Sequence, residues 1–102
     1  MKLIWTDPSV ADLRAIRDYI ARDSDAYAAD LVGDLILSAE RLLRFPRLGR
    51  AVPEAQDENI RELLYQNYRV IYRLVGERIE ILAIVHASRD LTARQPAPWK
   101  IG

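Results

Sequence analysis

Two arginines, Arg69 and Arg73, stand inside one of the best strand candidates of the chain, the run NYRVIYRL at residues 67–74. A guanidinium is costly to bury unless it is paired, so each arginine needs water or an anion opposite it. Because arginine presents a planar fork of N–H donors, the anions that suit it best are carboxylates and phosphates. Their spacing puts both side chains on one face of the strand. The pattern therefore indicates binding of an acidic partner or of nucleic-acid phosphate, with plain solvation as the alternative.

The single histidine, His86, is the best candidate for proton transfer. An unperturbed histidine has a pKa of about 6.5, which suits a general acid or a general base near neutral pH. His86 ends a strongly apolar run, and Arg89 follows three residues later. A lone histidine at the end of a strand more often has a structural role, with its ring hydrogen-bonded to a backbone carbonyl. The sequence leaves both roles open.

A second proton-transfer group is hard to find. The two lysines, Lys2 and Lys100, lie near the ends of the chain, and Ser88 lies near His86 without the third member of a catalytic triad. Four acidic residues could act as bases, although their commoner role would be to solvate a loop: Glu54, Asp57, Glu58 and Glu62. No complete acid–base set is present.

We expect no cofactor and no metal. The chain has one histidine and no cysteine, so a metal would depend on carboxylates, and no spacing gathers them. The four glycines are scattered at positions 33, 49, 76 and 102, which excludes a glycine-rich phosphate loop.

Two helices are predicted to support these residues. After a short apolar strand at residues 2–5, Thr6 or Asp7 caps a first helix that has Pro8 in its first turn. Ser24 or Asp23 caps a second helix, and Pro46 closes it. Two amphipathic helices joined by a few residues form an antiparallel hairpin.

Three strands are predicted after a loop at residues 46–59. They cover residues 60–65, 67–75 and 79–86, and their connections are so short that neighbours must be antiparallel. The third is nearly all apolar, as expected for a central strand or one buried on both faces. The order β-α-α-β-β-β predicts an α+β fold, an antiparallel twisted sheet with the two-helix hairpin packed on one face.

Strand alternation sorts the side chains of residues 68–75 onto two faces. Four of them suit the face beneath the helices: Tyr68, Val70, Tyr72 and Leu74. Arg69 and Arg73 would then lie on the opposite, open face. Arg61 would join them only if the register of its own strand agrees. A local alternative is that the two arginines pair with Glu62 or Glu80 on neighbouring strands.

Length and composition indicate one domain over residues 1–102, with a C-terminal tail from about residue 91 that Trp99 could pin. Residues 1–40 carry four basic and eight acidic groups, whereas residues 41–102 carry eleven and seven, so a polar binding face is plausible. No apolar run approaches the roughly 20 residues that span a bilayer, and no secretory signal is visible. We therefore expect a cytoplasmic protein without a membrane partner.

The chain resembles the RelE/ParE superfamily of toxins from bacterial type II toxin–antitoxin modules. The similar features are WTDPSVADLRAIRDYIA, FPRLGR, IRELLYQNYRVIYRL and IEILAIVHASRDL, which run in this order from residue 5 to about residue 91. The resemblance implies two possible chemistries. RelE-type members cut messenger RNA on the ribosome with cationic, tyrosine or histidine side chains, whereas ParE-type members lack most of that set and inhibit DNA gyrase.

The resemblance also assigns site residues. Arg69 falls where RelE-like nucleases hold a phosphate-binding arginine, and Arg89 lies near further functional cations, so a nuclease would use Arg69, His86 and Arg89. The incomplete acid–base set favours the ParE branch, in which Arg61, Arg69, Arg73 and Arg89 would contact the target or the antitoxin. In either branch a cognate antitoxin with an acidic or amphipathic C-terminal segment is implied, forming a hetero-oligomer, and DNA gyrase or the ribosome is the target. A member that binds antitoxin but has lost toxicity is the third possibility.

Overall fold

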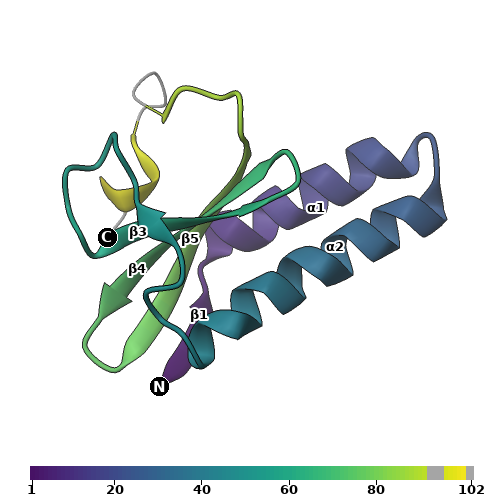
Figure 1. Ribbon diagram of the computed structural model, residues 1–102. Coiled ribbons are helices and arrows are strands. Elements are labelled where there is room, and N and C mark those ends of the chain that lie inside the picture. The colour runs from purple at the N-terminus through teal and green to yellow at the C-terminus, as the bar shows by residue number, and fades with distance from the viewer. Residues whose placement is uncertain (92–95, 101–102) are drawn as a thin grey trace.

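Two helices lie side by side against one face of a five-stranded sheet (Figure 1). The computed structural model describes residues 1–91 and 96–100. In chain order the elements are β1 (Lys2–Trp5), α1 (Asp7–Ala21), α2 (Asp25–Glu40), the 3₁₀ helix η1 (Arg41–Leu43), β2 (Arg50–Ala51), β3 (Ile60–Tyr65), β4 (Tyr68–Val75), β5 (Arg78–His86) and the 3₁₀ helix η3 (Pro98–Lys100). The predicted α+β fold is confirmed.

Both predicted helix caps are present. The Thr6 hydroxyl accepts a hydrogen bond from the Ser9 backbone N–H at 3.4 Å, and the Ser24 hydroxyl accepts one from the Tyr27 N–H at 3.1 Å. Each bond satisfies a backbone donor that the first turn of a helix leaves free. The Thr6 hydroxyl also donates to the Ile81 carbonyl at 2.7 Å, which ties the start of α1 to the centre of β5.

The sheet differs from the prediction at its two edges. Its strand order is β1-β5-β4-β3-β2, and β1 runs parallel to β5, so the sheet is mixed. The two-residue strand β2 lies in the predicted loop and pairs antiparallel with β3. The three central strands pair antiparallel, as their short connections require.

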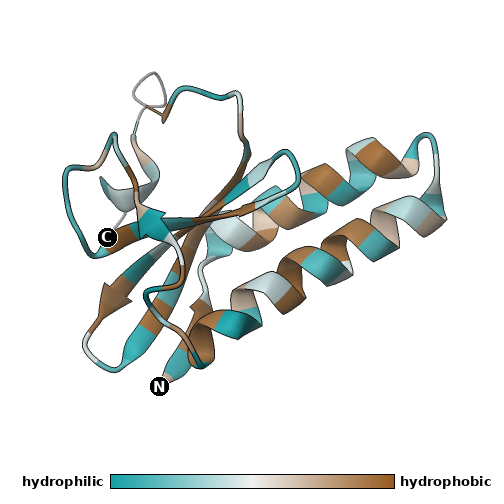
Figure 2. Ribbon diagram, in the orientation of Figure 1, coloured by the Kyte–Doolittle hydropathy of each residue, from teal (hydrophilic) through white to brown (hydrophobic). Residues whose placement is uncertain are grey.

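The main core lies between the helices and the sheet. Figure 2 shows hydrophobic residues along the central strands and at intervals along both helices. The buried members of this core are Leu13, Leu31, Leu35, Ala39, Leu42, Val70, Tyr72, Ile79, Ile81 and Ile84. Full burial of one such aliphatic side chain contributes about 1.5–3 kcal/mol. This core fixes which face of β4 meets the helices.

A β-bulge reverses the alternation halfway along β5. Ile71 pairs with Ala83 and Tyr72 pairs with Ile81, which leaves Leu82 as an extra residue on β5. Before the bulge Ile81 faces the helices, and after it Ala83 faces away from them. Because both faces are buried, β5 is apolar almost throughout, as predicted for a central strand.

The face of the sheet opposite the helices is covered, and the prediction that it is open is therefore wrong. A second buried cluster lies there, made of Val52, Ile60, Ile71, Leu82, Ala83, Val85 and Leu91, with Ala55 and Trp99 packed against it. Val52 and Ala55, after β2, and Leu91 and Trp99, near the C-terminus, form this cover. The physical cause is that β4 and β5 carry apolar residues on both faces, and burying the second set is favourable. Trp99 packs on the sheet, a position that the sequence left open, and tail residues 92–95 and 101–102 lie outside the described residues.

Candidate functional site

Arg69 lies on the face opposite the helices, as strand alternation predicts, and is held there by two carboxylates. Its Nε donates to Glu62 Oε1 at 2.9 Å, and its terminal nitrogens donate to the two Glu54 oxygens at 3.0 and 2.9 Å. Only 6% of Arg69 and 1% of Glu62 are exposed. Arg50 donates to the other Glu62 oxygen at 3.1 Å. The sequence predicts water or an anion opposite Arg69, and the structure shows that its partners are carboxylates of this chain.

The electrostatics of this cluster favour its charged form. The hydrogen bond to Glu54 raises the pKa of Arg69 against the opposing effect of burial, and the bond to Glu62 adds to it. Conversely, the hydrogen bond from Arg69 lowers the pKa of Glu54 below its ordinary value. A buried ion pair of this kind is costly to break, because the remaining charge loses both water and partner.

Arg73 is paired on the same face. Its Nε lies 3.0 Å from Glu80 Oε1, while Arg78 Nε lies 3.2 Å from the other Glu80 oxygen. The local alternative of pairing with Glu62 or Glu80 is thus what the structure contains.

Arg61 lies on the other face of the sheet. It pairs in register with Tyr72, whose side chain faces the helices. Its guanidinium donates to two backbone carbonyls at 2.9 Å, those of Gly49 and Glu58. The register left open by the sequence therefore separates Arg61 from Arg69 and gives it a role in fixing the segment before β2.

His86 also lies on the helix-facing side of the sheet. It pairs in register with Tyr68, and their rings meet edge to face with centroids 5.8 Å apart. Its Nδ1 accepts a hydrogen bond from the Ser88 N–H at 3.2 Å and lies 2.7 Å from the Ser88 hydroxyl. The partner of the His86 ring is thus Ser88. For a structural histidine we expect a backbone carbonyl instead.

Arg89 lines the same surface hollow as His86. Both line a hollow of about 550 Å³ against α1, together with Asp12 and Tyr19. The backbone carbonyl of Arg89 lies 3.5 Å from a terminal nitrogen of Arg69, and Arg89 also lines the hollow at His86. The structure therefore brings His86 and Arg89 together and leaves the Arg69 guanidinium on the opposite face.

The Tyr72 hydroxyl is a buried polar group that the sequence patterns did not single out. It accepts a hydrogen bond from the Gly49 N–H at 3.1 Å and donates one to the Pro46 carbonyl at 2.8 Å. Gly49 itself packs so closely on the backbone of Glu62 that a Cβ would overlap it. The FPRLGR segment held in this way was predicted only as loop. Gly49, between Leu48 and Arg50, was the one available signal of close backbone approach.

Neither a metal-ligand cluster nor a membrane-spanning helix is found in the described part of the chain. Residues 1–91 and 96–100 contain no group of three or more histidine, cysteine or acidic side chains that could hold a metal ion. No helix formed by the same residues is long and apolar enough to span a membrane.

Known proteins with similar sequences and structures are toxins of one superfamily. The family described as ParE toxin of type II toxin-antitoxin system, parDE, matches residues 3–91. Toxin RelE2 of Caulobacter vibrioides is 33% identical over 89 residues, which are 86% of this chain and 97% of that protein.

Solved structures agree with the sequence matches. A chain of the chromosomal ParDE toxin–antitoxin system from P. aeruginosa has a TM-score of 0.73 and 27% identity, covering 86% of this chain and 97% of its own. A chain of the RelBE2 toxin–antitoxin complex from Mycobacterium tuberculosis has a TM-score of 0.60 and covers 83% of this chain and 95% of its own, at 20% identity, which shows the fold alone. The chain therefore belongs to the ParE toxin family of type II toxin–antitoxin systems, within the RelE/ParE superfamily.

Proposed function

We propose that this chain is a ParE-like toxin that inhibits DNA gyrase by protein–protein contact in the cytoplasm. The observation that carries the proposal is the separation of the candidate nuclease residues. Cleavage of RNA through its 2′-hydroxyl requires an acid, a base and a cation around one phosphate. Here His86 and Arg69 lie on opposite faces of the sheet, and the Arg69 guanidinium is bonded to Glu54 and Glu62.

The alternative is a RelE-like endonuclease that cuts messenger RNA on the ribosome. Two observations favour it: the 33% identity to Toxin RelE2, and the exposed His86 beside Arg89. In this reading His86 and Arg89 act without Arg69, or the Arg69 cluster opens on the ribosome. Opening would cost the pairing energy of a buried charge, which makes this the second candidate.

We further propose that a cognate antitoxin neutralises the toxin. The matched family is described as the toxin of a type II toxin–antitoxin system, and the similar P. aeruginosa chain comes from such a system, which supports a partner of the same kind here. A segment that is acidic or amphipathic and folds on binding would suit a surface that carries exposed arginines. The toxin and antitoxin would then form a hetero-oligomer.

The experiment that tests the proposal is a supercoiling assay with purified chain, gyrase and relaxed plasmid. We expect loss of supercoiling or accumulation of cleaved DNA, and the same effect with His86→Ala. In parallel, the chain is added to a translation reaction and the messenger is mapped for cuts. Transcript cleavage that His86→Ala abolishes, together with unaffected gyrase, would replace the proposal by the nuclease.

A further inference from the structure

Four arginines recur at every third position in the segment after α2, RLLRFPRLGR: Arg41, Arg44, Arg47 and Arg50. Arg50 bonds to Glu62, but the described residues place no carboxylate within ion-pair distance of the other three, whose side chains are exposed. They differ in this respect from Arg69 and Arg73, which carry internal partners. In contrast to the sheet-face arginines, Arg41, Arg44 and Arg47 can therefore meet an acidic partner without breaking an internal ion pair.

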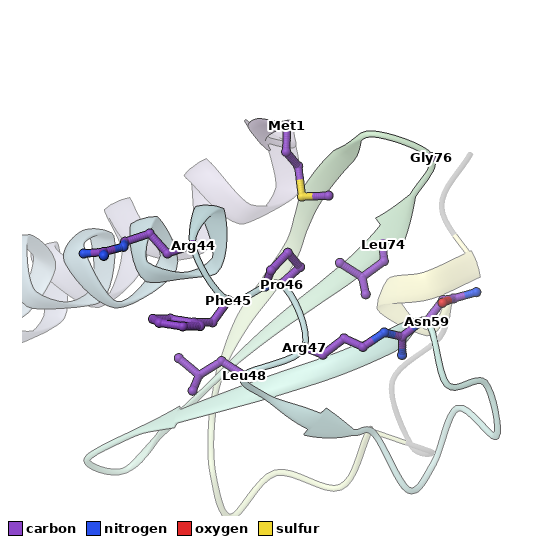
Figure 3. Close-up of a pocket in the computed structure, with 9 residues that line it drawn as sticks. All are labelled: Met1, Arg44, Phe45, Pro46, Arg47, Leu48, Asn59, Leu74 and Gly76. Atoms are coloured by element: carbon purple, nitrogen blue, oxygen red, sulfur yellow. The ribbon is translucent and has the colours of Figure 1, made fainter.

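An apolar groove lies beside these arginines. It measures about 780 Å³ and is lined by Met1, Arg44, Phe45, Pro46, Arg47, Leu48, Asn59, Leu74 and Gly76 (Figure 3). Phe45 is 58% and Leu48 41% exposed, so both leave apolar surface in water. In Figure 3 Arg44 extends along the side of α2, and Arg47 extends towards Asn59. The groove thus combines an apolar lining with cations at its margin.

The groove is held in place by the backbone of its own segment. The Tyr72 hydroxyl bonds to the Gly49 N–H and the Pro46 carbonyl, and Arg61 bonds to the Gly49 carbonyl. These contacts fix the chain on both sides of Leu48. The Arg44 guanidinium lies 5.9 Å from the centroid of the Phe45 ring, a cation–π distance. A surface that is already ordered loses less conformational entropy on binding than a flexible one.

We propose that this groove is the docking site of an acidic amphipathic segment of the antitoxin. The inference rests on the proposed toxin–antitoxin function and moves the antitoxin contact from the sheet-face arginines to residues 41–48. Apolar side chains of the segment would enter the groove between Phe45 and Leu74, and its carboxylates would meet Arg44 and Arg47. This is the arrangement of an amphipathic helix in a groove.

The lining favours a peptide over nucleic acid. Single-stranded nucleic acid binds on basic tracks with aromatic side chains on which successive bases stack. Phe45 is the single aromatic residue of the groove, whose other apolar residues, such as Met1, Leu48 and Leu74, offer no flat ring to a base. Aliphatic surface instead gains from burying aliphatic side chains.

The test uses a probe peptide and nuclear magnetic resonance. The ¹⁵N-labelled chain is titrated with a peptide of about 16 residues that has leucines at positions i, i+3, i+4 and i+7 and glutamates beside them. We expect amide shifts in residues 44–49 and 74–76. A peptide with lysine in place of every glutamate should bind at least tenfold more weakly.

Matched variants locate the contact. Leu48→Glu and the pair Arg44→Glu with Arg47→Glu should each weaken peptide binding at least tenfold. Leu64→Glu should leave it unchanged, because Leu64 is 59% exposed and lies in register with Arg69 on the face opposite the helices. The pair Arg14→Glu with Arg22→Glu, at exposed positions of α1 and its C-cap, should also leave it unchanged. Shifts elsewhere, equal binding of the lysine peptide, or equal losses in the control variants would each overturn the inference.

Three further results would also overturn it or separate it from the proposed function. Tighter binding of a 16-nucleotide RNA in the same groove would assign the groove to nucleic acid. Sedimentation showing a dimer that Leu48→Glu dissociates would assign it to a second copy of the chain. If the chain inhibits gyrase but does not bind the peptide, only this inference fails. If the chain binds the peptide but does not inhibit gyrase, this inference holds and only gyrase is rejected as the target.

Discussion

The imidazole of His86 and the guanidinium of Arg69 lie on opposite faces of the sheet, although their strands are paired neighbours. His86 is in register with Tyr68 on the helix-facing side, and Arg69 is the next residue of β4, in register with Val85 on the other side. Because successive residues of a strand point to opposite faces, this separation follows from the register itself. In this structure the two side chains therefore point away from each other, to the two sides of the sheet.

His86→Ala is accordingly expected to leave toxicity intact. The histidine ring contacts Tyr68 and Ser88 at the end of β5 and is exposed, so its loss should also change the free energy of unfolding little. Growth after induction without antitoxin provides the measurement. Growth restored by His86→Ala, with an unchanged melting temperature, would instead show that the imidazole acts in the toxic reaction.

Arg69→Ala is expected to destabilise the fold. It leaves the carboxylate of Glu62 buried without its main partner, and breaking a buried ion pair typically costs about 3–5 kcal/mol. Urea unfolding followed by circular dichroism measures this loss. Arg73→Ala is the matched control, because its partner Glu80 is more exposed and also bonds to Arg78. The control should lose clearly less stability.

Removing both charges should recover much of the stability lost in Arg69→Ala. In the double variant Arg69→Met with Glu62→Leu, apolar side chains of similar length replace the buried pair, a change that is often neutral or stabilising. The coupling free energy of the pair comes from a double-mutant cycle of four proteins. These are the unmodified chain, Arg69→Met, Glu62→Leu and the double variant. A coupling near zero would mean that the pair contributes nothing despite its geometry.

Stability should fall in acid through Glu54. The hydrogen bond from Arg69 lowers the pKa of Glu54 below its ordinary value of 4.5, so the folded chain favours the ionised carboxylate. Its contribution is complete above about pH 4.5 and is lost as the pH falls through the lower pKa of the folded state. Unfolding measured from pH 7 to pH 3 should show a shallower loss for Glu54→Gln. Glu58→Gln, a change at an exposed position in the same segment, should show the same pH dependence of the free energy of unfolding as the unmodified chain.

Gly49→Ala is expected to displace the FPRLGR segment. The added Cβ would overlap the backbone carbonyl of Glu62 and approach the Tyr72 hydroxyl at 2.9 Å. Overpacking of this kind costs about 1–3 kcal/mol. Gly33→Ala is the control, because a Cβ at Gly33 meets nothing within 4 Å and alanine favours the helix. Equal stability of the two variants would contradict the close packing at Gly49.

The regular elements could be predicted because each has a local cause. Thr6 and Ser24 supply the cap hydroxyls, and the connections between β3, β4 and β5 are too short for any but antiparallel pairing. The cross-strand pairing of Arg69 with Glu62 was foreseen as an alternative for the same reason. The parallel position of β1 could not be predicted, since it depends on contacts 76 residues apart in the chain, such as Lys2 with Arg78.

The site was harder to predict than the fold. The bulge at Leu82 changes which side chains of β5 face the helices. No residue type in this strand predicts the position of the bulge. The cover over the face that carries Arg69 consists partly of loop and tail residues without periodicity, such as Val52, Leu91 and Trp99. The groove beside Phe45 depends on the Tyr72 hydroxyl reaching a loop 26 residues away. Each of these features arises from tertiary packing.

Gyrase supercoiling in the presence of the purified chain tests most directly whether gyrase is the target. We expect the unmodified chain and His86→Ala to inhibit supercoiling with the same concentration dependence, while messenger RNA in a translation reaction stays intact. Unaffected supercoiling at high molar excess, together with transcript cleavage that requires His86, would contradict this expectation.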